Sequence, residues 1–121
     1  MGRGPGTTQT GPPETVSKPL RTEDEAIGEF QDAIRWYEER KAGLGAAFLA
    51  AVEATLDQIA RLPQAGTNVP RLPDDLPVRR APVKRFPYHV VYLESSEDIR
   101  ILAFAHDSRR PGYWYHRTRD L

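Results

Sequence analysis

Apolar residues recur every three or four positions in two neighbouring segments, which is the spacing of amphipathic helices. The first segment spans about residues 22 to 41, and the second runs from Leu44 to the helix-breaking Pro63. Only a short break containing Gly43 and Gly45 separates them, so the pattern predicts two antiparallel helices joined as a hairpin. The periodic positions are Ala26, Phe30, Ala33 and Tyr37 in the first segment and Leu44, Phe48, Val52, Leu56, Ile59 and Leu62 in the second.

Two further signals lie at the start of the first helix. Thr22 followed by Glu25 has the spacing of a capping box, in which each side chain accepts a hydrogen bond from a backbone N–H of the first turn. Before it, residues 15 to 20 predict a short strand. Because Pro19 has no N–H to donate, this strand is expected at an edge of a sheet.

From Val78 onward the apolar period changes to two, which indicates strands. Residues 86 to 93 and 99 to 106 flank a polar turn and predict a β-hairpin, with a shorter strand from Val78 to Val83 beside it. An irregular, proline-rich connection is expected over residues 63 to 77. In the hairpin, Phe86, Tyr88, Val90 and Tyr92 are predicted to face one way and His89, Val91 and Leu93 the other, while Ile99, Ile101, Ala103 and Ala105 alternate with Arg100, Leu102, Phe104 and His106.

Together these elements predict an α+β fold in the order β-α-α-β-β-β, with the helical hairpin on one face of a small, mostly antiparallel sheet. The opposite face and the C-terminal segment are expected to form a basic groove. Seven of the first 13 residues are Gly or Pro, so residues 1 to 14 are predicted to be a disordered tail. The domain is then expected over residues 15 to 116, followed by a C-terminal tail over residues 117 to 121.

Charge is balanced overall but unevenly distributed. The chain has 17 basic and 17 acidic residues; residues 1 to 62 hold 7 and 10 of them, net −3, and residues 63 to 121 hold 10 and 7, net +3. The second half is therefore the expected interacting half. The chain has no cysteine, which excludes disulfides and thiolate sites. Its three histidines lack suitably spaced carboxylate partners, so we expect no metal and no cofactor.

Apolar runs are too short to cross a membrane, and the N-terminus has no apolar core of a secretory signal. These features favour the cytoplasm and no membrane partner.

Basic residues gather in the second half. No acidic residue interrupts residues 78 to 92, which contain Arg79, Arg80, Lys84 and Arg85 and predict a surface for an anion or an acidic partner. Arg79 and Arg80 have an alternative role, since charges on an edge strand discourage pairing between sheets. The adjacent Arg109 and Arg110 are also expected to meet a carboxylate or phosphate. Trp114 is expected either to fix the C-terminal segment by packing or to bind a partner.

In this order of elements, several segments resemble the RelE/ParE superfamily of type II toxin–antitoxin toxins, which includes plasmid stabilisation proteins. The resemblance covers about residues 15 to 116. Its segments are residues 36 to 40 (WYEER), the GLG of residues 43 to 45 with Phe48, the RFPY of residues 85 to 88 with VVY at 90 to 92, Ala105-His106, and RRPGYW at residues 109 to 114.

The resemblance implies a bacterial growth inhibitor neutralised by a cognate antitoxin that covers its working surface. ParE-like members act on DNA gyrase, whereas RelE-like members cleave mRNA on the ribosome. A third possibility is a decayed toxin that only binds its antitoxin.

If the chain were RelE-like, the resemblance would assign catalysis to three residues. His106 would transfer a proton, Arg109 (or Arg110) would stabilise transition-state charge, and Tyr113 would stack on a base. Lys84 and Arg85 would hold phosphate. His106 has an alternative role as a hydrogen-bonding cap at the end of its strand. RelE-type nucleases usually carry Arg at the position after His106, where this chain has Asp107; a carboxylate there would repel phosphate and favours a ParE-like target.

Overall fold

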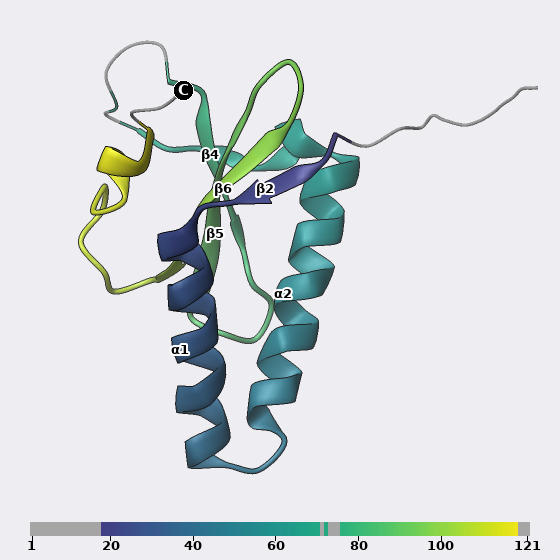
Figure 1. Cartoon of the computed structure of the whole chain (residues 1–121), viewed down its shortest axis with the longest axis vertical. Helices are drawn as coiled ribbons and strands as arrows, with labels where there is room; N and C mark the ends of the chain where they lie inside the picture. The colour runs from purple at the N-terminus through teal and green to yellow at the C-terminus, as the bar shows by residue number, and fades with distance from the viewer. Residues whose placement is uncertain (1–17, 71, 73–75, 119–121) are drawn as a thin grey trace, which may run out of the picture.

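A computed structural model describes residues 18–70, 72 and 76–118 and confirms the α+β fold (Figure 1). Both helices lie side by side on one face of a sheet with the strand order β2-β6-β5-β4-β3. Strand β2 runs parallel to β6, and the other neighbours are antiparallel. The elements are β2 (Leu20–Thr22), α1 (Asp24–Arg40), α2 (Leu44–Arg61), the 3-10 helix η1 (Pro63–Ala65), β3 (Thr67–Asn68), β4 (Val78–Pro82), β5 (Tyr88–Glu94), β6 (Ile99–His106) and the 3-10 helix η2 (Tyr115–Thr118).

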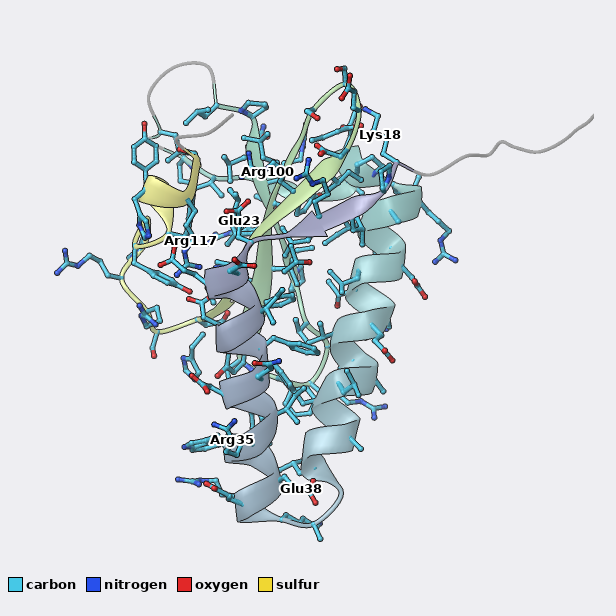
Figure 2. All side chains as sticks on the ribbon, viewed as in Figure 1. Lys18, Glu23, Arg35, Glu38, Arg100 and Arg117 are labelled. Carbon is cyan, nitrogen blue, oxygen red and sulfur yellow. The ribbon has the colours of Figure 1, made fainter. Side chains whose placement is uncertain are left out.

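The predicted helical hairpin is confirmed, and a side chain of α1 builds its turn. The Glu38 carboxylate accepts hydrogen bonds from the backbone N–H groups of Gly43, at 3.0 and 3.1 Å, and of Gly45, at 3.0 Å. Gly43 has a φ of 91°, which favours glycine. Figure 2 shows Glu38 at the end of the hairpin where α1 passes into α2. One carboxylate therefore satisfies N–H groups that the start of α2 leaves unpaired.

The expected capping box at Thr22 is wrong. Thr22 ends strand β2 opposite Ile101, and α1 begins at Asp24 without a side-chain cap. The Glu23 N–H donates to the Ile101 carbonyl at 3.0 Å, and the Glu23 carboxylate pairs with Arg100. Pairing with β6 thus uses Thr22, which would have been the cap, whereas Glu25 pairs with His116 of the C-terminal segment. The strand predicted over residues 15 to 20 is observed at Leu20–Thr22, on the expected sheet edge; residues 15 to 17 and the predicted N-terminal tail lie outside the described residues.

Strict alternation along β6 is also wrong, because the strand carries a β-bulge. Val91 pairs with Ala103 while Tyr92 pairs with Ile101, which leaves Leu102 as an extra residue. Leu102 and Ala103 therefore both pack on the face away from the helices, and Phe104 returns to the helical side. A bulge shifts the register by one residue, so every later side chain of the strand lies on the opposite face of the sheet from the one that strict alternation predicts.

The sheet is covered on both faces. Between sheet and helices lies a core that includes Phe48, Tyr92 and Ile101. On the other face, Trp114 is only 3% exposed and packs with residues of β4, β5 and β6. The open basic groove expected on that face is therefore absent from the part of the chain that the structure describes, because the C-terminal segment and the side chains of Val69, Leu72 and Leu76 cover it. Within the connection expected over residues 63 to 77, the sequence also missed the two-residue strand β3 (Thr67–Asn68).

Candidate functional site

A groove of about 970 Å³ runs between α2 and β4. Its helical side is built from small residues, so the helix backbone is accessible to an incoming chain. The floor and ends are largely apolar. The residues that shape it include Ala47, Ala50, Ala51 and Ala54 of α2, with Leu62, Ala81 and Phe86.

Three basic residues form one wall of this groove: Arg80 of β4, and Lys84 and Arg85 of the turn before β5. None of them forms an ion pair with another described residue. Arg85 has a φ of 72°, a left-handed conformation that is uncommon for a residue other than glycine. The groove therefore combines unpaired positive side chains with an apolar floor. These features are complementary to an acidic, amphipathic segment of a partner protein.

Arg79, the fourth member of the predicted cluster, has a structural role. Its guanidinium donates to the Gly66 carbonyl at 2.8 Å. The Tyr92 hydroxyl accepts from the Gly66 N–H at 3.1 Å and donates to the Pro63 carbonyl at 2.7 Å. Burial raises the pKa of Tyr92 above its ordinary value. Arg79 and Tyr92 together fix the segment between α2 and β3, which forms one end of the groove.

A second polar cluster centres on Glu29 of α1. Its carboxylate accepts hydrogen bonds from the Tyr113 hydroxyl at 2.6 Å, from the Arg117 guanidinium at 3.0 and 3.1 Å, and from the Phe104 N–H at 3.1 Å. Arg117 also donates to the carbonyl of the bulged Leu102 at 2.9 Å. Figure 2 shows Arg117 between the C-terminal segment and the start of α1. Glu29 thus joins α1, β6 and the C-terminal segment.

Neither Glu29 nor Arg117 was a candidate from sequence. The Arg117 side chain is only 6% exposed, and the ordered fold continues through Thr118, so the predicted start of the C-terminal tail at residue 117 is wrong. The ion pair anchors this segment because a buried guanidinium requires a partner. Glu29 lies on a helix that carries both polar and apolar residues, and no motif in the sequence distinguishes it from the acidic residues that face solvent.

Tyr113 lies within the Glu29 cluster. Burial, and then its hydrogen bond to Glu29, raise the pKa of Tyr113 well above its ordinary value. The Arg109 guanidinium covers one face of its ring at 3.7 Å from the centroid. The tyrosine hydroxyl is therefore held protonated, and one ring face is closed to stacking by a nucleic-acid base.

His106 caps a turn. Its Nδ1 accepts from the Ser108 N–H at 3.0 Å and lies 2.8 Å from the Ser108 hydroxyl. Its ring meets Tyr88 edge-on, with centroids 5.1 Å apart. Asp107, the next residue, pairs with His89 at 2.9 Å. These contacts give His106 a local structural role at the end of β6.

The structure divides the predicted site residues into separate groups. The turn before β5 and the end of β6 are joined, because the Asp107 N–H donates to the Pro87 carbonyl at 2.8 Å. However, no hydrogen bond, ion pair or aromatic contact among the described residues links Lys84 or Arg85 to the second group. The groove group contains Arg80, Lys84 and Arg85; the second contains His106, Arg109 and Tyr113; Arg110 is exposed beside it; and Trp114 is buried in the core.

The described residues contain no group of three or more His, Cys, Asp and Glu side chains that could hold a metal ion. None of the helices in the described part of the chain is long and apolar enough to span a membrane.

Comparison with known proteins assigns the family. Among curated proteins, no match was found. The fold is similar to a solved structure described as the chromosomal ParDE TA system from P. aeruginosa, with a TM-score of 0.53 and 19% sequence identity over 74% of this chain and 96% of that chain. The family model described as "ParE toxin of type II toxin-antitoxin system, parDE" matches residues 20–111, which is most of the chain. The chain therefore belongs to the ParE toxin family of type II toxin–antitoxin systems.

Proposed function

We propose that this toxin arrests bacterial growth by binding a protein target, DNA gyrase, in the cytoplasm rather than by cleaving mRNA. Membership of the ParE family supports this proposal. The neighbouring structure, described as a ParDE toxin–antitoxin system, supports an antitoxin as the second partner.

The observation that carries the choice of target is the state of Tyr113. Cleavage of RNA through the ribose 2′-OH needs a base for that hydroxyl and an acid for the leaving oxygen. The Tyr113 hydroxyl already donates to Glu29 at 2.6 Å, and the Arg109 guanidinium covers one face of its ring. His106 is engaged with Ser108, and the Asp107 carboxylate adds negative charge where a phosphate would approach. Among the described residues, Tyr113 and His106 are thus both engaged in other contacts, which supports binding of a protein target over cleavage of RNA.

For the antitoxin, we propose the groove between α2 and β4 as the docking site. Its alanine-rich side allows close approach of a helix or an extended segment. Its wall of Arg80, Lys84 and Arg85 is complementary to acidic side chains on one edge of that segment. An acidic antitoxin would therefore bury apolar residues in the groove and pair its carboxylates with the wall.

Expression of the chain alone in bacteria tests the proposed function. We expect growth arrest with filamentous cells, because blocking gyrase damages DNA and delays division, and we expect purified protein to inhibit supercoiling by gyrase in vitro. His106→Ala should leave both effects unchanged, since this residue caps a turn.

Two results would contradict the proposal. Arrest without filamentation, together with new mRNA 5′ ends that disappear in His106→Ala, would establish the nuclease function instead. Normal growth with soluble, folded protein would identify a decayed toxin that only binds its antitoxin.

A further inference from the structure

The strand side of the groove between α2 and β4 offers an incoming chain few backbone groups to pair with. Arg80 of β4 already pairs with Thr67 of β3. Beyond Arg80, Pro82 has no N–H to donate, and its carbonyl accepts a hydrogen bond from the Thr55 hydroxyl at 3.4 Å. A strand added here would therefore leave backbone groups of its own unpaired. Recognition in the groove consequently depends on side chains.

On the helical side of the groove, the side chains are apolar except at two positions. Thr55 is buried, and its hydroxyl donates to the Ala51 carbonyl at 3.1 Å. Gln58 is exposed, and its side-chain amide forms no hydrogen bond with another described residue. The Gln58 amide is therefore available to a partner, whereas the Thr55 hydroxyl is already engaged.

A segment that fills the groove must cover Gln58. This residue lies one helical turn from Ala54 on one side and from Leu62 on the other, and all three line the groove. A chain that contacts both neighbours passes over the Gln58 amide and removes it from water. An amide that is buried without a partner is costly, whereas one that is hydrogen-bonded is not. The partner must therefore present a polar side chain at this one point between apolar contacts.

The basic wall of the groove acts in a different way. Arg80, Lys84 and Arg85 are exposed, long side chains that can reach carboxylates at more than one position along a segment. They favour acidic segments as a class. The shorter, uncharged side chain of Gln58 adds a condition at a single position, and it rejects segments that carry an apolar residue there.

We propose that Gln58 is the specificity-determining residue of the groove, and that the antitoxin segment bound there hydrogen-bonds to its amide through one hydroxyl, amide or carboxylate side chain. The Gln58 amide has both donors and an acceptor, so each of these groups is complementary to it. The inference rests on the proposed function, since it takes the groove to be the antitoxin site.

The test measures binding of the purified cognate antitoxin to Gln58→Leu by calorimetry. We expect binding to be at least tenfold weaker, because the polar group of the antitoxin is then buried without a partner. Gln31→Leu is the matched control, since Gln31 is an exposed glutamine of α1 that does not line the groove. It should bind antitoxin as the wild type does. Leucine is a good helix former, and circular dichroism melting shows whether each variant is folded.

Replacing each polar residue of the antitoxin by leucine in turn identifies the partner of Gln58. One replacement should weaken binding to the wild-type toxin by a similar factor, and it should cause no further loss when the toxin carries Gln58→Leu. Its first half uses only the wild-type toxin, so it tests the inference even if Gln58→Leu does not fold: no replacement that weakens binding would overturn it.

Outcomes of these measurements separate the inference from the proposed docking site. Unchanged or tighter binding of antitoxin by Gln58→Leu would overturn the role of Gln58, and so would equal weakening by Gln31→Leu or losses that add fully for every antitoxin replacement. The groove would remain the antitoxin site if the combined Arg80→Glu and Arg85→Glu variant still bound more weakly. Wild-type affinity of that charge-reversed variant would overturn the groove itself as the antitoxin site, and the role of Gln58 with it.

Discussion

Single side chains connect parts of this molecule that are distant in sequence. Glu29 accepts hydrogen bonds from Phe104, Tyr113 and Arg117, and Tyr113 is 84 residues away. Hydrogen bonds to a charged group contribute about 1.5–3 kcal/mol each, more than bonds between neutral groups. The C-terminal segment is therefore held over the sheet by a small number of strong contacts in addition to the burial of Trp114.

At this scale we predict that Tyr113→Phe lowers the free energy of unfolding by about 1–2 kcal/mol at neutral pH, because the hydroxyl no longer donates to Glu29. The folded state raises the pKa of Tyr113, so its contribution is complete below the unfolded value of about 10 and declines as the pH rises above it. The difference between wild type and variant should therefore shrink in alkaline buffer. Urea unfolding at pH 7 and at about pH 10.5, just above that unfolded value, measures it.

Tyr115→Phe provides the matched control for this prediction. Tyr115 is 38% exposed, and no side-chain hydrogen bond of its hydroxyl is present among the described residues. Equal losses in the two variants, or a Tyr113→Phe effect that does not change with pH, would contradict the role of the Glu29 contact.

Among the elements, the junction of α1 and α2 shows how closely the two helices approach. A Cβ atom on Gly45 would lie 2.8 Å from the Ile34 carbonyl oxygen and 3.0 Å from the Glu38 Cβ. By contrast, Gly28 lies within α1, and a Cβ atom there would meet no neighbouring element within 4 Å. The same residue type thus serves helix packing at one position and has no packing role at the other.

We predict opposite effects for alanine at these two positions. Alanine is favoured over glycine in a helix interior by about 1 kcal/mol. Gly28→Ala should therefore raise the free energy of unfolding by about 0.5–1 kcal/mol, whereas Gly45→Ala should lower it by at least about 1 kcal/mol because the helices must separate. Thermal melting of the two variants measures both changes, and stabilisation by Gly45→Ala would show that the hairpin can relax at no cost.

For the whole molecule, the sheet separates two apolar clusters, and the proposed antitoxin groove lies beside the helical layer, between α2 and β4. Figure 1 shows α1 and α2 as neighbouring but separate ridges of the helical layer. The groove lies at the α2 side of this layer, so its charge can be changed without altering α1.

We predict that the double variant Arg80→Glu and Arg85→Glu weakens antitoxin binding at least tenfold, because two of the three positive charges of the groove wall are reversed. Growth arrest by the chain alone should persist. Arg61→Glu is the control, since Arg61 is an exposed cation of α2 that does not line the groove. Calorimetric titration of each variant with antitoxin at low and high salt measures the effect, and equal weakening by Arg61→Glu would indicate only a general charge effect.

Much of the fold could be predicted from local patterns. The helical period of α1 and α2 and the alternation in β5 depend on neighbouring residues, so the sequence shows them directly. The family could also be identified from sequence, because its segments occur in a fixed order along the chain. Within the candidate site, the sequence pointed to Arg79, Arg80, Lys84 and Arg85 as a group. The last three line the groove, whereas Arg79 donates to the Gly66 carbonyl.

The sequence by itself therefore determined the helical hairpin, the main strands and the family. Tertiary structure alone decided the parallel pairing of β2 with β6, the bulge at Leu102, the closure of the second sheet face by Trp114, and the contact of Tyr113 with Glu29. The physical reason is distance along the chain. A contact such as that between Glu29 and Arg117 leaves no period in the sequence, because its geometry exists only after the intervening strands have paired.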